Sequence, residues 1–330
     1  MSSTELHSIV VPMYNESQVA EEFVRRATLA LTSLPGYEII VVDDGSTDET
    51  YAIVSALADN DPHIKLVRFA RNFGHQTATT AGIDLASGDT VTVIDADLQD
   101  PPEVIAQMVE LWRSGADIVF AVRSSRAGES AFKTATAALY YRLLRRTANV
   151  DIPLDTGDFR LMSRRATEGL KSMRERSRYM RGLVGWMGME RASITYDRDE
   201  RFAGQTKYPL RKMLHLASDG IMSFSTMPLR IATVLGLASA GLGFVVALNA
   251  VVTKLTGGYV VPGWTSTIVA VLFVGGVQLI TLGVVGAYIG RIYDEVRSRP
   301  LYLVEAVKGF DQDTAEHFSR SPLPSPKDPS

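Results

Sequence analysis

Several common signatures are missing from the 330-residue sequence, and each absence excludes a class of site. Without cysteine the chain can form neither disulfide bonds nor thiolate metal sites. It has no G-x-G-x-x-G motif after its first predicted strand, no P-loop motif and no H-E-x-x-H motif, so the usual dinucleotide, P-loop and zinc sites are not indicated. The first apolar run, Ser8–Val11, is too short for a signal peptide. We therefore expect the amino-terminal part of the chain to remain in the cytosol.

Charged side chains are distributed unevenly, although the net charge is only −3. Residues 1–122 contain 6 Lys and Arg against 19 Asp and Glu, whereas residues 123–212 contain 20 against 10. An acidic region can hold a metal ion, and a basic region can face phosphates or anionic lipid headgroups. Two solvated surfaces of opposite sign would give the same counts. The hydrophobic content of 46% is enough for one large domain with an appendage.

The first 125 residues alternate short β-branched runs with helical stretches. This alternation predicts a mostly parallel α/β sheet with helices on both faces and functional residues at the carboxyl ends of the strands. The expected strands are Ser8–Val11, Tyr37–Val42, Lys65–Phe69, Asp89–Ile94 and Asp117–Val122. The expected helices are Glu16–Leu34, Thr47–Asn60, His75–Ala86 and Pro102–Ser114, the second capped by Ser46 or Thr47.

Two uncharged segments near the end of the sequence, Ile231–Val252 and Trp264–Gly290, each exceed the roughly 20 residues that cross a hydrocarbon core. Buried helices of a soluble protein are the alternative. Basic residues flank the pair, and the loop between them has only Lys254. The positive-inside rule therefore predicts a multi-pass protein of the cytoplasmic (inner) membrane with both termini in the cytoplasm.

The segment before the first span has apolar residues at helical spacing between Leu210 and Phe224, which indicates an interfacial helix lying on the membrane or, equally, a core helix. The tail from Asp311 has four prolines among its last nine residues and is predicted to be disordered. The predicted organisation is a cytosolic α/β domain at 1–206, an amphipathic segment at 207–229, two spans at 230–291 and a cytoplasmic tail at 292–330.

Asp95 and Asp97 directly follow the predicted strand Asp89–Ile94. If the chain is still extended there, alternate side chains share one side and the two carboxylates converge. Close carboxylates repel each other unless a cation joins them, and hard oxygen ligands suit Mg²⁺ or Mn²⁺. Such an ion would bridge the diphosphate of a nucleotide-sugar and stabilise charge on the leaving group. A single D-x-D is a weak signal, but here it ends a strand and continues into the segment Leu98–Glu103.

Polar and aromatic residues also follow the first two strands. Tyr14 can stack on a nucleobase, and Glu16 or Asp44 can accept hydrogen bonds from a base or ribose. Structural roles are equally available, since Asn15 can cap a helix and Asp44 can form a turn. Together with the D-x-D, these residues at three strand ends favour a nucleotide site.

Four motifs together resemble glycosyltransferase family 2, and specifically its polyprenyl-phosphate branch; they are Val11–Glu16, Val42–Asp48, Asp95–Glu103 and Gly157–Leu161. The resemblance implies a GT-A fold and an inverting, metal-dependent transfer of one sugar from a nucleotide-sugar to polyprenyl phosphate. Two spans after the catalytic domain are similar to the bacterial glucosyl type, which favours UDP-glucose. GDP-mannose and modified UDP-sugars stay open as alternatives.

The resemblance also implies roles for individual residues. The metal and the diphosphate would be served by Asp95, Asp97 and Gln99. The nucleotide pocket would be lined by Pro12, Tyr14, Glu16, Asp44 and Asp95. The acceptor phosphate would meet Arg123, Lys133, Arg201 and Lys207. Catalysis would depend on Asp97, Arg201 and Asp158, the last placed near the reacting sugar. One departure from the family pattern is Ala137-Ala138, where a more polar helix is expected.

The acceptor's own chemistry bears on the role of Asp158. A phosphate monoester has a second pKa near 6, so it is mostly dianionic at neutral pH and already nucleophilic. Asp158 could therefore orient the sugar or an arginine instead of removing a proton. The expected partners are a nucleotide-sugar, polyprenyl phosphate, the lipid bilayer and further copies of the chain in a homo-oligomer, with no nucleic acid.

Two rival functions would require other features in the sequence. A processive polysaccharide synthase would need a Q-x-x-R-W motif and a longer membrane channel, and the sequence has neither. A non-catalytic membrane scaffold is at odds with an intact acidic motif and an intact basic segment.

Overall fold

The computed structural model describes residues 5–124, 156–176, 178–198, 226–256 and 263–311, which form two compact units. The first, here called the sheet unit, contains the described residues up to Arg198 and those from Arg299 onward. The second, here called the hairpin unit, contains the described residues from Thr226 to Ser298.

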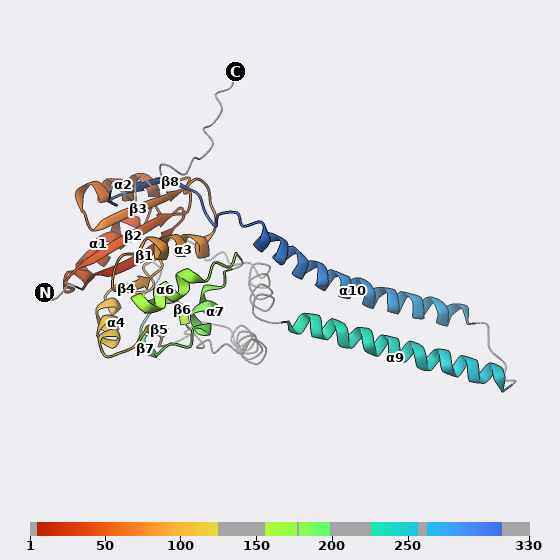
Figure 1. Ribbon diagram of the computed structural model, residues 1–330. Helices are drawn as coiled ribbons and strands as arrows, with labels where there is room; N and C mark the ends of the chain where they lie inside the picture. The colour runs from red at the N-terminus through yellow and green to blue at the C-terminus, as the bar shows by residue number, and fades with distance from the viewer. Residues whose placement is uncertain (1–4, 125–155, 177, 199–225, 257–262, 312–330) are drawn as a thin grey trace, which may run out of the picture. The chain divides into compact units, whose positions relative to one another are not determined.

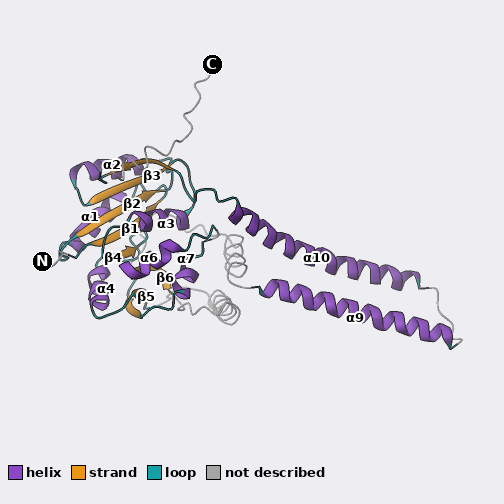
Figure 2. Cartoon of the chain, viewed as in Figure 1, coloured by secondary structure: helices purple, strands orange, loops and turns teal. Residues whose placement is uncertain are grey.

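The sheet unit is built on one eight-stranded sheet with the order β7-β5-β6-β4-β1-β2-β3-β8 (Figures 1 and 2). The pairs β1/β2, β1/β4, β2/β3 and β5/β7 are parallel. Strand β6 runs antiparallel to both β4 and β5, and β8 runs antiparallel to β3. The strands are β1 His7–Met13, β2 Tyr37–Asp43, β3 Ile64–Phe69, β4 Thr90–Val93, β5 Ile118–Arg123, β6 Thr156–Ser163, β7 Arg191–Tyr196 and β8 Val304–Lys308.

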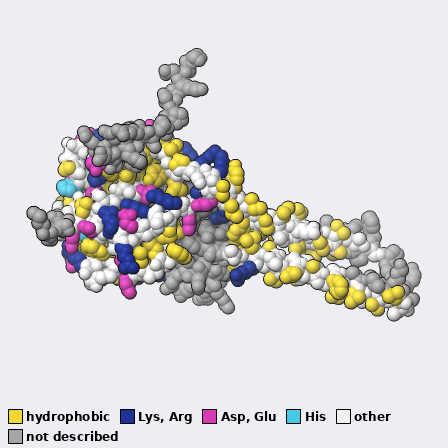
Figure 3. Space-filling model, in the orientation of Figure 1, with side chains coloured by type: hydrophobic (Ala, Val, Ile, Leu, Met, Phe, Trp, Pro, Cys, Tyr) yellow, Lys and Arg dark blue, Asp and Glu magenta, His cyan; other side chains and the backbone are white. Residues whose placement is uncertain are grey.

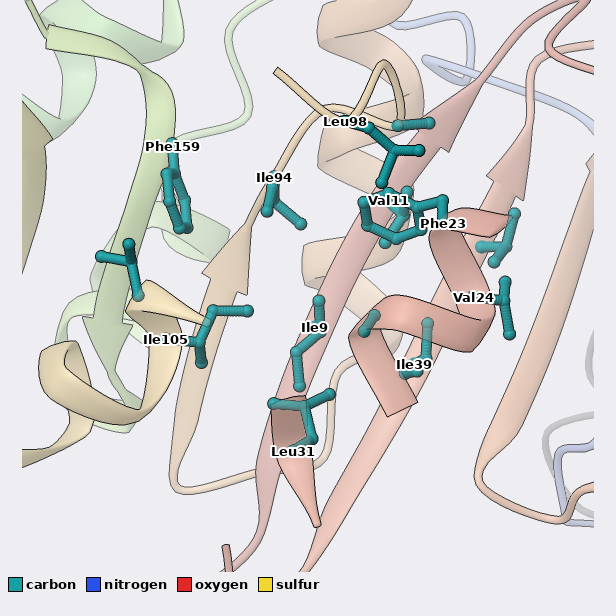
Figure 4. Close-up of a cluster of buried hydrophobic side chains, with 14 of the residues drawn as sticks. Ile9, Val11, Phe23, Val24, Leu31, Ile39, Ile94, Leu98, Ile105 and Phe159 are labelled. Atoms are coloured by element: carbon teal, nitrogen blue, oxygen red, sulfur yellow. The ribbon is translucent and has the colours of Figure 1, made fainter. Parts of the chain in front are cut away.

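Helices cover both faces of this sheet. On one face, α1 and α4 bury Phe23, Leu31 and Ile105 against Ile9 and the other inward side chains of the central strands (Figure 4). On the other face, α3 and α6 pack on the central strands. The helices of the unit are α1 Ala20–Leu31, α2 Thr50–Asn60, α3 His75–Leu85, α4 Val104–Arg113, α6 Arg164–Ser172 and α7 Met180–Trp186.

Helix α3 lies close to the sheet because of one glycine. A Cβ atom built on Gly82 would lie 2.2 Å from Cγ1 of Val10 in β1, so only glycine fits without moving the helix. This close packing fixes the distance between α3 and β1. It thereby helps to position His75, the first residue of α3.

The predicted strands and helices of residues 8–122 are all present, and their bounds differ by a few residues. The fourth strand ends at Val93, one residue earlier than expected. The predicted cap of the second helix is wrong, because α2 begins at Thr50 and its amide donates to the carboxylate of Asp48 at 3.0 Å. Ser46 instead accepts a hydrogen bond from the amide of Asn15 at 2.9 Å.

Strand β8 lies in the part of the chain that was expected to be a cytoplasmic tail. Residues 304–308 pair with β3 and form one edge of the sheet, so the chain returns to the sheet unit after the two long helices. Residues 312–330 and most of the predicted interfacial segment 207–229 lie outside the described residues.

The hairpin unit consists of α9, Met227–Leu255, and α10, Trp264–Val296, which contact each other along their lengths. Both contain a stretch that is long and apolar enough to cross a membrane, with mean hydropathies of 1.8 and 2.2. Among the described residues of these helices, many large apolar side chains are exposed, and Leu279 is 72% exposed. Hydrophobic atoms are visible along both helices in Figure 3. Because unpaired apolar surface of this extent is costly in water, these helices require an apolar environment such as lipid.

Candidate active site

Parallel strands bring the predicted motifs to one edge of the sheet. The register pairs Met13 with Asp43, so the segments that follow β1 and β2 emerge together, and β4 ends beside β1. Strand β6 runs the opposite way and therefore begins at this edge. It pairs Arg160 with Val93, the last residue of β4, and Nε2 of His75 lies 3.6 Å from Oδ1 of Asp95 and 3.7 Å from Oδ2 of Asp158.

The D-x-D segment itself forms a turn. Residues 96–97 have left the strand conformation, so the expected convergence of alternate strand side chains does not apply. Leu98 adopts a left-handed backbone with φ of 59°, which costs roughly 1–2 kcal/mol for a residue with a Cβ atom. Its side chain is buried in the core (Figure 4), and burial of a leucine contributes about 1.5–3 kcal/mol in return. The amide of Gln99 then donates to Oδ1 of Asp97 at 3.1 Å.

Asp95 carries a carboxylate oxygen that the described protein does not satisfy. Its Oδ1 is buried without a hydrogen-bond partner, and the nearest cationic group is Nε2 of His75 at 3.6 Å. Burial raises the pKa of Asp95 to about 6; His75 partly counteracts this, whereas the nearby charges of Asp158, Asp100 and Asp97 raise the pKa further. A buried acidic oxygen with these properties would be stabilised by a cation.

The residues of this turn fit a divalent ion that takes only part of its ligands from the protein and the others from water and substrate phosphates. Among the residues that the structure describes, no group of three or more His, Asp or Glu side chains is placed to enclose a metal. Mg²⁺ sites of nucleotide enzymes commonly use one or two carboxylates and take their other ligands from water and substrate phosphates. The unsatisfied oxygen of Asp95 and the adjacent carboxylate of Asp97 agree with such a site, and Gln99 stays a predicted ligand.

Asp158 is held by positive charges. Arg181 donates to both of its oxygens, from Nε to Oδ1 at 3.1 Å and from Nη2 to Oδ2 at 3.2 Å. Arg160, fully buried in β6, lies 3.5 Å from Oδ1, and Nε2 of His75 lies 3.7 Å from Oδ2. Burial alone would raise the pKa of Asp158, but Arg181, His75 and Arg160 together hold it well below its usual value.

Three members of this cluster had no role in the sequence analysis. His75 is the first residue of α3 and follows β3 at the same sheet edge as the predicted motifs, a signal that could have identified it. Arg160 belongs to the quoted motif Gly157–Leu161. Arg181 lies in α7, and no local pattern links it to Asp158.

The predicted nucleotide residues take different positions around the ends of β1 and β2. Tyr14 is 45% exposed and is free of the core, as a stacking residue must be. Pro12 is buried within β1 opposite Val42. The amide of Glu16 donates to Oγ1 of Thr50 at 2.9 Å. Oδ1 of Asn15 accepts a hydrogen bond from the amide of Thr47 at 2.9 Å. These contacts join the two loops into one surface beside Tyr14.

Asp44 organises a third loop. It is only 2% exposed, and its two oxygens accept hydrogen bonds from the amides of Phe73 at 2.6 Å and Gly74 at 2.9 Å. Burial raises its pKa, while these two amides counteract the shift. The Asp44 carboxylate therefore positions the segment that leads into His75, and direct contact with a nucleotide stays a prediction.

Arg123 is the one predicted acceptor-phosphate residue within the described ranges. Its Nη2 lies 3.6 Å from Oδ1 of Asp100, and its Nε donates to the hydroxyl of Tyr196 at 3.4 Å. A Cβ atom on Gly157 would lie 3.3 Å from Nη2 of Arg123, so this guanidinium sits over the residue that directly precedes Asp158 in β6. Lys133, Arg201 and Lys207, with Ala137 and Ala138, lie outside the described residues.

Sequence comparisons assign the chain to a family. The profile of Glycosyl transferase family 2 matches residues 8–170, which contain the strand ends, the acidic turn and Asp158. A glycosyltransferase of Bacillus subtilis, YkcC, whose function is uncharacterised, is 47% identical over 94% of this chain and 97% of its own length. The chain belongs to glycosyl transferase family 2. It is therefore a glycosyltransferase, and the predicted GT-A fold is confirmed.

A phage enzyme, a profile of the two long helices and a solved structure also match this chain. The bactoprenol glucosyl transferase of Shigella phage SfII is 43% identical over 90% of this chain and 97% of its own length. The profile of the GtrB C-terminal hairpin matches residues 227–292, which are α9 and most of α10. Among solved structures, glucosyl-3-phosphoglycerate synthase from Mycobacterium tuberculosis, in complex with Mn²⁺, UDP-glucose and phosphoglyceric acid, has a TM-score of 0.49 and 22% identity over 67% of this chain and 78% of that chain.

Proposed function

We propose that this family 2 glycosyltransferase moves glucose from UDP-glucose to the phosphate of bactoprenol, a polyprenyl acceptor, and releases UDP. The observation that carries the proposal is that His75 lies within 3.7 Å of both Asp95 and Asp158, so that the acidic turn stands beside a carboxylate held by Arg181. Arg123 lies over Gly157, next to Asp158. The choice of bactoprenol and glucose is supported by the similarity to the bactoprenol glucosyl transferase of Shigella phage SfII, which aligns over 97% of its own length.

The donor half of the site would use the strand ends of β1, β2 and β4. Tyr14 would stack on the uracil, and the loop held by Asp44 would border the ribose. Asp95 and Asp97 would hold Mg²⁺ or Mn²⁺ on the diphosphate, and the bound ion would supply Lewis-acid stabilisation of the leaving group. Asp158, His75 and Arg181 would then surround the hexose. Their fixed orientation would present C1 to the acceptor.

The part of the site that receives the acceptor phosphate has to compensate the negative charges of the two phosphate groups, and it needs no strong base. A bactoprenol phosphate oxygen forms the new bond to C1 as the bond from C1 to the diphosphate breaks on the opposite side, which inverts the configuration. The negative charge that the acceptor phosphate loses on esterification appears on the departing UDP, so no proton has to be removed. The depressed pKa of Asp158 makes it a weak base, which agrees with an orienting role. Arg123 and Arg181 would reduce repulsion between the two phosphate groups.

We also propose that the hairpin unit spans the inner membrane with both chain termini in the cytoplasm, since basic residues flank the pair of helices. A membrane-embedded hairpin keeps the enzyme where a lipid-linked acceptor is found. Assembly into a homo-oligomer is part of the proposal, because the small residues of α9 and α10 permit close helix packing.

The experiment is a transfer assay with the full chain in detergent or nanodiscs, using radiolabelled UDP-glucose, bactoprenol phosphate and Mn²⁺. We expect a lipid-linked monosaccharide that is extractable into organic solvent. GDP-mannose and modified UDP-sugars are tested in parallel, because they are the alternative donors. The Asp97→Asn variant is the matched control, since it keeps the side-chain shape but removes a ligand charge.

Each rival predicts a different result from the same assay. A processive synthase would give a polymer, and a non-catalytic scaffold would give no product with any donor. If GDP-mannose alone yields lipid-linked sugar, the choice of glucose is wrong and the reaction class stands. If the lipid fraction stays unlabelled with every donor, the proposed function is wrong.

A further inference from the structure

The segment that follows α10 contacts the sheet unit at several places, two of which lie on different helices. Residues 299–311, here called the return segment, include β8, which extends the sheet beside β3. Near its end, Nζ of Lys308 donates to Oγ of Ser55 at 2.8 Å and to Asp59 at 2.6 Å, both in α2. Near its start, Tyr302 contacts α3 and the end of β3. The two attachments are on different elements, so their effects can be separated.

Tyr302 touches the flanks of α3 in two ways. Its hydroxyl donates to Oδ2 of Asp84, the penultimate residue of α3, at 3.0 Å. Its ring stacks on Phe69, the last residue of β3, with centroids 5.1 Å apart and an interplanar angle of 16°. Burial and the Asp84 carboxylate both raise the pKa of Tyr302, so the hydroxyl keeps its proton and remains a donor at neutral pH. One side chain therefore contacts both the end of β3, six residues before α3 begins, and the carboxyl end of α3.

Phe69 transmits this contact to the active site. The ring of Phe73 meets Phe69 edge-on, with centroids 5.6 Å apart and an interplanar angle of 88°. The amides of Phe73 and Gly74 are the two donors that hold Asp44, and His75 follows them directly. Edge-to-face aromatic pairs and buried hydrogen bonds to a carboxylate have strict geometry. A displacement of Phe69 would therefore reach both Asp44 and His75.

We propose that Tyr302 is a positioning residue of the active site, which fixes the Phe73–His75 segment and helix α3 although it lies 218 residues from its partner Asp84. Through Tyr302, the start of the return segment supports the active site, whereas β8 and Lys308 form the edge of the sheet and its attachment to α2. The kinetic part of this inference rests on the proposed function, because it concerns the use of the nucleotide-sugar. The structural part does not depend on which sugar is transferred.

The test uses the full chain with three substitutions in the return segment. Tyr302→Leu removes the ring stack and the hydroxyl, and Tyr302→Phe removes only the hydroxyl. Lys308→Met is the matched control, since it weakens the same strand at its attachment to α2 and does not touch α3. The measurements are the thermal midpoint, kcat and KM for the nucleotide-sugar, and hydrogen exchange of the amides of Phe73 and Gly74.

We expect Tyr302→Leu to lower kcat/KM on the order of ten-fold or more, because a shift of about 1 Å in catalytic groups can cost up to a hundred-fold. Exchange of the Phe73 and Gly74 amides should become faster, since both are protected by Asp44. Tyr302→Phe should show a smaller loss of kcat/KM. Lys308→Met should lower the thermal midpoint while leaving kcat/KM and these two amides unchanged.

Two results would overturn the inference. One is an unchanged kcat/KM and unchanged amide exchange in Tyr302→Leu. The other is the same loss of kcat/KM in Lys308→Met as in Tyr302→Leu, which would mean that the return segment only stabilises the fold. If the wild-type chain transfers no sugar, the proposed function fails, and the amide exchange of Tyr302→Leu against Lys308→Met alone decides the inference.

A second pair of variants covers the case in which Tyr302→Leu does not fold. Tyr302→Phe and Asp84→Asn each weaken the same hydrogen bond from opposite ends. Asp84→Asn also weakens the ion pair with Arg174, at 2.7 Å. Combined in one protein, the two changes should lower kcat/KM no further than the more damaging single variant, because the Tyr302 hydroxyl acts through Asp84. Fully additive losses would show that Tyr302 and Asp84 act separately, which contradicts the proposal.

Discussion

Arg181 binds Asp158 with two parallel hydrogen bonds, one to each carboxylate oxygen, at 3.1 and 3.2 Å. This fork leaves the carboxylate with a fixed plane and a full negative charge, facing His75 and the turn that carries Asp95. In a transferase whose nucleophile is already anionic, such a group serves orientation better than proton removal. The predictions below follow from this arrangement and from its neighbours.

Replacing Arg181 should impair turnover more than donor binding. Arg181→Met frees Asp158 to rotate, and misorientation of about 1 Å can cost on the order of a hundred-fold in kcat. The affinity for UDP, measured by calorimetry, should stay close to wild type because the proposed nucleotide contacts lie at β1 and β2. Arg165→Met, a change at a 77% exposed arginine of α6, is the control and should have no effect. If the two variants have equal kcat values, the proposed role of Arg181 in the active site is wrong.

Removal of the metal should abolish transfer. Asp97→Asn takes one negative charge from the turn, and excess chelator takes the ion itself, so both should reduce transfer to the background level while the thermal midpoint of the apoprotein is retained. Mn²⁺ titration in the presence of UDP, followed by calorimetry, should give binding in the wild type and none in the variant. Undiminished turnover in chelator contradicts the metal role.

Glu38 should contribute stability that depends on pH. Burial would raise its pKa, but hydrogen bonds from Lys65, Ser8 and Ser87 outweigh burial and lower it. A carboxylate with a depressed folded-state pKa stabilises the fold above its unfolded pKa, and this contribution is lost as the pH falls through the folded value. Glu38→Gln should therefore cost about 1.5–3 kcal/mol at pH 7, the range for a hydrogen bond to a charged group.

The pH dependence separates this effect from a general defect. The difference in thermal midpoint between wild type and Glu38→Gln should shrink once the pH falls below the ordinary glutamate value of 4.5. Glu22→Gln, at an exposed ion pair with Arg25, is the control and should leave the midpoint unchanged at every pH. A difference that stays constant with pH would mean that the charge of Glu38 is irrelevant.

Topology can be tested with single cysteines, because the chain contains none. A cysteine at Gly258, between the two long helices, should react with an impermeant thiol reagent added outside cells whose outer barrier is permeable. A cysteine at Ser2 should react only after lysis. The reverse pattern would overturn the arrangement that the flanking basic residues predict.

The parts of this protein that depend on local pattern could be predicted from its sequence. Buried parallel strands are continuous apolar runs, so β1, β2 and β3 were found within a residue or two. The helices α9 and α10 were found because each contains an uncharged apolar run longer than the roughly 20 residues that cross a hydrocarbon core. The acidic turn was located because it directly follows a strand, although the left-handed Leu98 that shapes it was not foreseen.

The parts that depend on distant pairing could not be predicted. The antiparallel register between β4 and β6 pairs Val93 with Arg160 and so brings the start of β6, with Asp158, to the edge where β4 ends, and a register is a property of two strands. Arg181 reaches Asp158 from a separate helix, 23 residues along the chain. Strand β8 is five residues long and half-exposed, so its periodicity does not separate it from a loop.

The position of β8 has a consequence for how the protein is made. At about 5–20 residues per second, the ribosome needs roughly 12–47 s to go from the end of β3 at Phe69 to the start of β8 at Val304. During that interval β3 presents an open edge with unpaired amides and carbonyls, and such edges promote aggregation. The catalytic sheet is closed only after both apolar helices have been synthesised. Completion of the catalytic sheet therefore has to follow synthesis of the hairpin, and a chain that stops within the hairpin would leave the edge of β3 unpaired.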